Sequence, residues 1–270
     1  MATDAIAVEG LSKLFPAAQT GWRAFLAPFA RLTQPALTDV TFRVAPGESF
    51  AVIGANGAGK STLLRILTAL LLPSAGRAAV CGLDVVRDAG NARRLLGFHS
   101  GAEAGFYARL TARQNLRFFA RLRNIQPKEI EREIEEVSVR IGLSESLDRQ
   151  VRTLSSGTIQ RLSLARAVLH APRVLLLDEP TRSLDPLSAS SFRAFLREEL
   201  VHKGGATLLF ASHTLSEVDQ LADRVALLDA GRLLFCGAPA ALLEKTSAAT
   251  LEEAMSRLVR HSAAGSDPTP

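Results

Sequence analysis

The sequence predicts an α/β protein built on a parallel sheet, with more strands at one edge and an inserted block of helices. Residues 50–53 are a short apolar run, and a glycine-rich turn follows them and leads into a predicted helix at 61–67. A second apolar run, 174–177, ends at the adjacent carboxylates Asp178 and Glu179. Short branched runs of this kind are typical of central parallel strands, and ligands of such sheets bind where these strands end.

The glycine-rich turn predicts a nucleotide-phosphate site. Gly54-Ala55-Asn56-Gly57-Ala58-Gly59-Lys60-Ser61-Thr62 fills every fixed position of the pattern G-x-x-x-x-G-K-[ST]. Glycines leave consecutive backbone N–H groups free to face a phosphate, and the start of the next helix adds to the attraction. An accidental glycine-rich turn does not explain the strand before it and the helix after it. The motif therefore predicts a P-loop NTPase (RecA-like) core whose nucleotide-binding residues are Gly54, Asn56, Gly57, Gly59, Lys60, Ser61 and Thr62.

The chemistry of nucleotide hydrolysis assigns roles to two side chains of this loop and to the two carboxylates after the second apolar run. Lys60 is placed for the β- and γ-phosphates, and Ser61 and Asp178 are the expected Mg²⁺ ligands. Glu179 lies beside Asp178, where it could activate an attacking water. A strand that ends in Asp-Glu usually marks only a polar strand end, but together with the phosphate loop it predicts a catalytic magnesium site.

Three further motifs resemble those of the ATP-binding cassette (ABC) ATPases. The segment 154–167, which begins Leu-Ser-Ser-Gly, resembles their signature sequence and signature helix. Residues 183–186 are similar to the D-loop of the family, and Ser212-His213, after the apolar run 207–211, is similar to its switch histidine. The order of the motifs matches the family from Phe15 to about Gly237, and 106–116 and 181–186 resemble the ABC-2 exporter-like group.

The resemblance implies that two nucleotide-binding domains pack head to tail around ATP and Mg²⁺. Ser155 and Gly157 of one domain would then contact the γ-phosphate bound by the other, with Asp185 among the nucleotide-contacting residues. An ordinary helix cap is the alternative for Ser155. His213 would contact the γ-phosphate and orient the water, although a lone histidine after a strand is more often structural. Phe15 would stack on adenine, with burial in the core as its alternative.

The sequence departs from the family pattern at two places. The stretch 97–107 lacks the glutamine that family members usually carry there, in a loop that contacts Mg²⁺ and couples to the membrane partner. Gln114 is a poor substitute because it belongs to a predicted helix that begins at Thr111, and neither Glu103 nor Ser100 is favoured as a replacement. The second departure is Ser156, which replaces the usual first glycine of the signature.

The remaining patterns divide the chain. The nucleotide-binding core is expected at 1–97 and 162–240, the helical subdomain at 98–161, a C-terminal helical segment at 241–262 and a disordered tail at 263–270. Core strands are expected at 174–178, 207–211 and 224–229, with a turn at Gly231-Arg232, and helices at 111–124 and 127–141. Strands at 5–9, 38–44, 49–53 and 77–81 are expected to form the β-rich edge.

Two surface features leave alternatives open. An insertion at 16–35 carries Trp22, Phe25, Leu26, Phe29 and Leu32 at near-helical spacing, so it could lie on a membrane surface or pack against its own core. Arg109, Arg113, Arg117 and Arg121 recur at every fourth residue and predict a basic row on a helix. Most such rows are solvated faces, and docking of a membrane partner or of anionic lipid is the alternative.

Composition is consistent with this interpretation. The 270 residues include 32 basic and 27 acidic ones, which gives a net charge of +5. This modest excess does not by itself indicate which class of partner the protein binds. The two cysteines lack metal-ligand spacing, and neither a signal peptide nor a membrane-spanning segment is apparent. We therefore expect the ATPase subunit of a transporter at the cytoplasmic face of the cell membrane, with a transmembrane permease in a separate chain.

Each motif occurs once, so a second nucleotide-binding domain is required. The complete motif set favours a homodimer, and a heterodimer is also compatible. The rival function is a soluble ABC ATPase that acts on nucleic acid or ribosomes. Such proteins commonly carry two cassettes or long coiled-coil insertions, and this sequence shows neither, so no nucleic-acid partner is expected.

Overall fold

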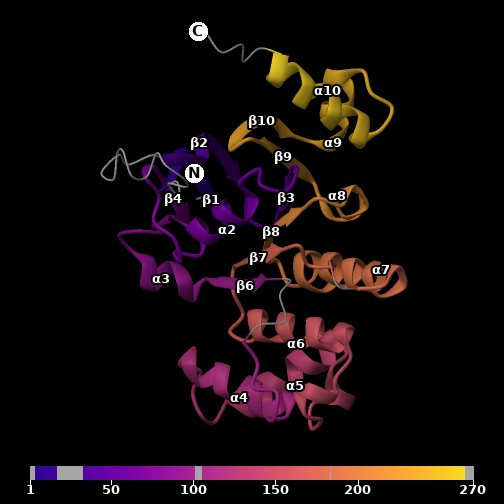
Figure 1. The fold of residues 1–270 in the computed structure, drawn as a ribbon. Coiled ribbons are helices and arrows are strands. Elements are labelled where there is room, and N and C mark those ends of the chain that lie inside the picture. Colours follow the sequence, from indigo (N-terminus) through magenta and orange to yellow (C-terminus); the bar gives the residue numbers. More distant parts are fainter. Residues whose placement is uncertain (1–3, 17–32, 101–104, 183, 265–270) are drawn as a thin grey trace, which may run out of the picture.

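The computed structural model describes residues 4–16, 33–100, 105–182 and 184–264 (Figure 1). Its larger sheet has six strands in the order β10-β9-β3-β8-β7-β6. The strands β3, β8, β9, β7 and β6 run parallel to their neighbours, and only β10 is antiparallel, in a hairpin with β9. The bounds are β3 (Ser49–Ile53), β6 (Leu96–Ser100), β7 (Val174–Asp178), β8 (Thr207–Ser212), β9 (Arg224–Asp229) and β10 (Arg232–Gly237).

A smaller antiparallel sheet has the order β2-β1-β4-β5. Its strands are β1 (Ile6–Pro16), β2 (Thr33–Val44), β4 (Ala75–Val80) and β5 (Leu83–Asp84). The prediction that 49–53 belongs to this edge is wrong, because β3 pairs in parallel with β8 and β9 in the middle of the larger sheet. The sheets meet at the stacked rings of Phe42 and Phe50, whose centroids lie 5.2 Å apart.

Alternation along the parallel strands separates two apolar cores. Phe50 and Val52 of β3 face the smaller sheet and helix α2 (Lys60–Leu67). Ala51 and Ile53 belong to the other core, which includes residues of the remaining main helices. Because both faces are covered, the central strands β3, β7, β8 and β9 are mostly apolar, which explains why the sequence pattern predicted their positions. The helices that contribute to the second core are α4 (Ala112–Leu122), α5 (Ile130–Ile141), α6 (Ser156–Val168), α7 (Pro186–Phe195), α8 (Leu215–Leu221), α9 (Pro239–Thr246) and α10 (Leu251–Ala264).

The helical block of α4, α5 and α6 lies beyond β6 at one end of the larger sheet, and α9 and α10 lie near β10 at the other end (Figure 1). Leu116 of α4, Ile134 of α5 and Leu162 of α6 are fully buried in the core of the helical block. Strand β6 continues to Ser100, so the sheet extends past the expected start of the block at residue 98. Shorter elements complete the fold: α3 (Ala89–Arg94), the 3₁₀ turns η1 (Ser144–Ser146) and η2 (Val151–Thr153), and the π-helix η3 (Leu196–His202), which continues α7.

Several expectations fall at or outside the limits of the described residues. Only the ends of the predicted insertion are described, where Pro16 pairs with Thr33 across the β1–β2 hairpin. Its apolar side chains from Trp22 to Leu32, and residues 265–270 of the predicted tail, lie outside the described residues. No helix in the described ranges is long and apolar enough to span a bilayer.

Candidate functional site

The glycine-rich loop connects β3 to α2 and is closed on one side and open on the other. Gly59 precedes the helix with a φ of 105°, and a Cβ there would lie 2.5 Å from the carbonyl oxygen of Ala36. Gly57 also has a positive φ, of 84°, but a Cβ there would meet nothing within 4 Å. The first N–H groups of a helix lack partners within it, so this open side can receive an anion.

Lys60 stabilises the loop from within. Its ammonium Nζ donates hydrogen bonds to the carbonyl oxygens of Gly54, at 2.7 Å, and Ala55, at 3.0 Å. Burial lowers the pKa of Lys60, and the negative charges of Glu179 and Asp178 act in the opposite direction. The carboxylates at the end of β7 and the lysine of the loop therefore belong to one electrostatic unit.

Asp178 ends β7 beside the phosphate loop. Burial is the main cause that raises its pKa, whereas a hydrogen bond with Ser61 lowers it. Glu179 follows with a positive φ of 50° and is held on both carboxylate oxygens. Its Oε1 lies 2.9 Å from His213 Nδ1, and its Oε2 lies 3.3 Å from Arg182 Nη1 in an ion pair without hydrogen-bond geometry.

Arg182 and Glu217 are site residues to which the sequence analysis assigned no role. Thr181 donates a short hydrogen bond to the carboxylate of buried Glu217 on α8, which fixes the turn after β7. That turn carries Arg182 to Glu179. The spacing of Arg182 three residues after Glu179 is a visible signal, but nothing in the sequence indicates that Glu217 folds back to this turn.

The signature residues lie on a different part of the molecule. Ser155 caps α6 by accepting a hydrogen bond from the Thr158 N–H at 3.2 Å, and a Cβ on Gly157 would lie 3.7 Å from Leu184. Helix α6 belongs to the helical block, whereas α2 packs on the opposite face of the sheet (Figure 1). Asp185 caps α7 by accepting from the N–H groups of Leu187 and Ser188, each at 3.1 Å.

Phe15 lies near the end of β1, where it pairs with Gln34. The side chain is not buried in the core, because the residue is 37% exposed and its ring lies 5.2 Å from Lys13 Nζ. The structure thus contradicts the core-burial alternative and leaves an accessible aromatic face.

The stretch without a glutamine begins in β6. Ser100 pairs with Asp178 in the β6–β7 register, and Glu103 lies outside the described residues. Gln114 forms a reciprocal capping box with Thr111 at the start of α4, which agrees with its rejection as a metal ligand. His99, in the same strand, is fully buried, and its Nδ1 lies 2.9 Å from Ser163 Oγ on α6. Burial lowers the pKa of His99 to about 4.

The predicted basic row is mostly exposed, at Arg109, Arg117 and Arg121, but two of its members form ion pairs. Helix α4 begins at Ala112, so Arg109 lies before it. Arg113 Nε donates to Asp148 at 2.9 Å and its Nη1 contacts Glu135 at 2.5 Å, while Arg117 pairs with Glu131. The sequence pattern did not reveal these carboxylates, because they come from α5 and from the loop after it.

Comparison with known proteins gives the family. The family model described as "ABC transporter" matches residues 37–182. The chain is 38% identical over 226 residues to the ABC transporter ATP-binding protein NatA of Bacillus subtilis, covering 83% of this chain and 91% of NatA. It is also 38% identical over 234 residues to the daunorubicin resistance ATP-binding protein DrrA3 of Streptomyces coeruleorubidus, covering 87% of this chain and 68% of DrrA3.

A solved structure agrees with these sequence matches. Clostridium perfringens CbiO1, described as part of the ABC transporter complex CbiONQ, superposes with a TM-score of 0.75 at 25% identity. The superposition covers 90% of this chain and 92% of CbiO1. The phosphate loop and the strand that ends in Asp178 and Glu179, with Glu179 held by His213, agree with these matches. This chain belongs to the ABC transporter family, as an ATP-binding subunit with the P-loop NTPase fold.

Proposed function

We propose that this subunit hydrolyses ATP to drive a separate membrane permease, in an exporter of the ABC-2 type. The observation that carries the proposal is the position of Glu179, held by His213 beside a phosphate loop and the half-buried Asp178. The exporter class rests on the resemblance of 106–116 and 181–186 to that group. A relative whose name records daunorubicin resistance supports it.

The residues present fit ATP with Mg²⁺. Ser61 and Asp178 offer hydroxyl and carboxylate oxygens that already lie within hydrogen-bonding distance of each other. Mg²⁺ prefers oxygen ligands and usually takes only one or two protein carboxylates, leaving its other positions to phosphate oxygens and water. The described residues contain no cluster of three or more His, Cys, Asp or Glu side chains that could hold a metal alone. Ser61 and Asp178 would therefore hold Mg²⁺ together with the nucleotide, and the ion would neutralise charge on the phosphates.

The chain's own groups divide the remaining work. Lys60 would exchange its contacts with the Gly54 and Ala55 carbonyls for phosphate oxygens, and the N–H groups from Gly57 to Thr62 would cradle them. Glu179 would accept a proton from the attacking water, and His213 would hold that carboxylate in position. Phe15 would stack on adenine through its exposed ring.

A second nucleotide-binding domain would complete each site. Ser155 and Gly157 lie at the accessible start of α6, away from the phosphate loop of their own chain. In a head-to-tail dimer they would cap the γ-phosphate bound by the partner domain, with Asp185 at the same interface. The complete motif set favours a homodimer at the cytoplasmic face of the membrane, and pairing with a related cassette is the alternative.

The test is purification of the tagged chain with its partner from native membranes, followed by identification of the co-purified protein and reconstitution in liposomes. We expect a permease that raises ATP hydrolysis several-fold, and we expect Glu179→Gln to abolish that activity. Glu244→Gln, an exposed change on α9, is the matched control and should leave activity intact. A wild-type chain that binds no ATP, or that acquires ATPase activity only with RNA or ribosomes, would contradict the proposal.

A further inference from the structure

A buried hydrogen bond joins the two segments that carry Glu179 and His213. Thr181 lies two residues after Glu179, and Glu217 lies four residues after His213. The Thr181 hydroxyl donates to Glu217 Oε1, and the two residues are only 8% and 2% exposed. The same two segments therefore meet twice, once through the Glu179–His213 contact at 2.9 Å and once through this Thr181–Glu217 link.

The first segment is a turn that holds Glu179 in an unfavourable backbone conformation. Glu179 has a φ of 50°, which a residue with a side chain keeps only where its surroundings hold it there. Its N–H donates to the carbonyl oxygen of Ala211 in β8 at 2.9 Å, and its own carbonyl oxygen accepts from the Arg182 N–H at 3.3 Å. These contacts fix the start of the turn to the sheet, and Thr181 adds a side-chain connection to α8.

The second segment leads from β8 into α8. The side chain of His213 is 48% exposed, so packing alone does not fix the ring that meets Glu179. Helix α8 begins two residues after His213, and Glu217 lies in its first turn. The hydrogen bond from Thr181 to Glu217 therefore sets where the start of this helix lies relative to the turn after β7.

The chemistry of the Thr181–Glu217 link is not what stability alone favours. Among the described residues, no basic side chain forms an ion pair with Glu217, so its buried carboxylate depends on a neutral hydroxyl. Burying a carboxylate without a basic partner costs free energy, and well-packed apolar side chains in such places often make a protein more stable. A role in positioning the catalytic groups would account for a cost that packing does not require.

We propose that Glu217 is a positioning residue for hydrolysis, which acts through Thr181 on the backbone that carries Glu179. The link holds the turn and the start of α8 together. The Glu179 carboxylate and the His213 ring then keep the arrangement in which the glutamate accepts a proton from the attacking water. This inference rests on the proposed function, and it assigns a role to a residue that acts only through others.

Matched substitutions test the link by steady-state ATPase kinetics of the full chain. Thr181→Val keeps the shape of the side chain but removes the donor, whereas Thr181→Ser keeps the donor. We expect Thr181→Val to lower kcat about tenfold with little change in KM for ATP, and Thr181→Ser to retain most of the rate. Glu217→Leu and Glu217→Gln should behave as the same kind of pair, because glutamine still offers an oxygen to the hydroxyl.

A double variant separates positioning from stability. Thr181→Val alone leaves a buried carboxylate without its donor and should lower Tm. Thr181→Val combined with Glu217→Leu places two apolar side chains together, so Tm should return to about the wild-type value while kcat stays about tenfold lower. In a Glu179→Gln chain, Thr181→Val should cause no further loss of rate, because the link acts through that glutamate.

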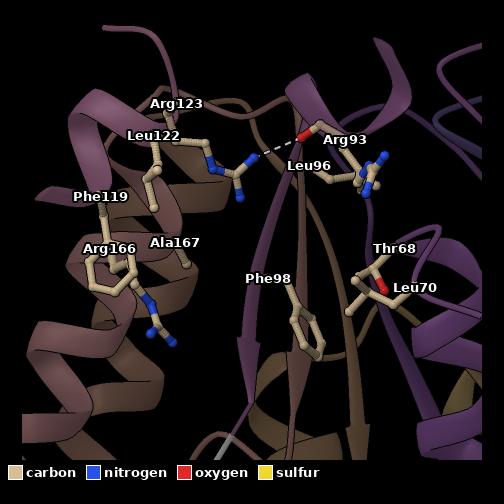
Figure 2. A pocket seen from close by; sticks show the side chains of 10 residues that line it. All are labelled: Thr68, Leu70, Arg93, Leu96, Phe98, Phe119, Leu122, Arg123, Arg166 and Ala167. Atoms are coloured by element: carbon tan, nitrogen blue, oxygen red, sulfur yellow. Dashed lines mark hydrogen bonds between the residues drawn. The ribbon is translucent and has the colours of Figure 1, made fainter. Parts of the chain in front are cut away.

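A hydrogen bond elsewhere in the molecule provides the control. Arg123 Nη1 donates to the carbonyl oxygen of Arg93 at 2.9 Å, as the dashed line in Figure 2 shows. The described residues that line the pocket in Figure 2 include none from β7, α7 or α8. Arg123→Gln should therefore leave kcat and KM for ATP unchanged.

Three results would overturn the proposal: a wild-type kcat in Thr181→Val, a double variant that recovers the rate together with Tm, or a further tenfold loss when Thr181→Val is added to Glu179→Gln. Loss of ATP binding by the double variant would also overturn it, because the link would then support the fold rather than the base. Any of these results in a protein whose wild type hydrolyses ATP contradicts this inference alone. A wild-type chain that hydrolyses no ATP contradicts the proposed function.

Discussion

At the scale of single residues, Lys60 is the clearest case of a side chain that would exchange partners on ligand binding. Its ammonium group now contacts two carbonyl oxygens of its own loop, and burial lowers its pKa. A phosphate would supply charge that those carbonyls lack. We therefore expect Lys60→Ala to weaken ATP binding by about 2 kcal/mol, roughly thirtyfold, as measured by nucleotide titration. Lys128→Ala, an exposed change, is the control, and unchanged ATP affinity in a folded Lys60→Ala protein would refute this role.

Arg182 offers a second test at this scale. Its guanidinium lies 3.3 Å from Glu179 Oε2, opposite the oxygen that His213 holds. The arginine side chain is 70% exposed, so solvent screens the pair and the expected effect is modest. Arg182→Gln should lower kcat about two- to fivefold without changing KM for ATP, and Arg182→Lys should restore most of the rate. Steady-state kinetics decides the matter, with Arg197→Gln as a control for loss of a surface charge.

At the scale of elements, the predicted strands were most accurate where both faces of a strand are buried. The apolar runs at β3, β7 and β9 have the bounds expected from the sequence, because every position in a covered parallel strand favours apolar residues. Strand β6 was missed, since it contains a glycine, a histidine and a serine. Its histidine is fully buried and meets Ser163 of a distant helix, and no local sequence pattern shows such a contact.

The candidate site divides in the same way. The loop 54–62 and the pair Asp178-Glu179 could be predicted because each consists of consecutive residues that form a recognisable motif. Arg182 and Glu217 were not assigned a role, because each acts through a contact that depends on the fold. The arginine row is a mixed case: Arg109, Arg117 and Arg121 are exposed, as a solvated row predicts, but the carboxylates that pair with Arg113 belong to other elements and were not visible in the sequence pattern.

The ion pairs between α4 and α5 carry a prediction about stability. Arg113 is 20% exposed and contacts Asp148 and Glu135. Arg113→Ala should lower Tm by a few degrees, for a loss of about 1 kcal/mol after allowing for solvent screening. Arg121→Ala, an exposed change on the same helix at a residue that forms no ion pair with the described residues, should leave Tm unchanged.

The Tm difference between wild type and Arg113→Ala should depend on pH, because the partners of Arg113 are carboxylates. Arg113 lowers the pKa of Asp148, so the pair contributes stability at neutral pH. That contribution is lost as pH falls through the lowered pKa. The Tm difference between wild type and Arg113→Ala should therefore disappear in acid, and should shrink in high salt. A difference that persists under both conditions would indicate lost packing rather than lost charge.

At the scale of the whole molecule, the residues proposed to act in hydrolysis lie in two places. The phosphate loop, Asp178 and Glu179 meet at the core, while Ser155 and Gly157 begin a helix of the helical block. The start of α6 offers N–H groups to an anion, but the chain already has one phosphate loop at another position. Two copies arranged head to tail would bring each part to its complement.

The decisive prediction at this scale concerns Glu179→Gln. Glutamine keeps the shape of the side chain but removes the base, so hydrolysis should fall about 10²–10⁴-fold while ATP still binds. ATP would then remain between the phosphate loop of one copy and Ser155 and Gly157 of the other. In size-exclusion chromatography, the variant should elute as a dimer with ATP and as a monomer with ADP or without nucleotide. Adding Gly157→Glu should eliminate the dimer, because a carboxylate would face the γ-phosphate across the interface. A double variant that still dimerises with ATP, or a Glu179→Gln chain with the wild-type rate, would show that the two copies do not share their sites in this way.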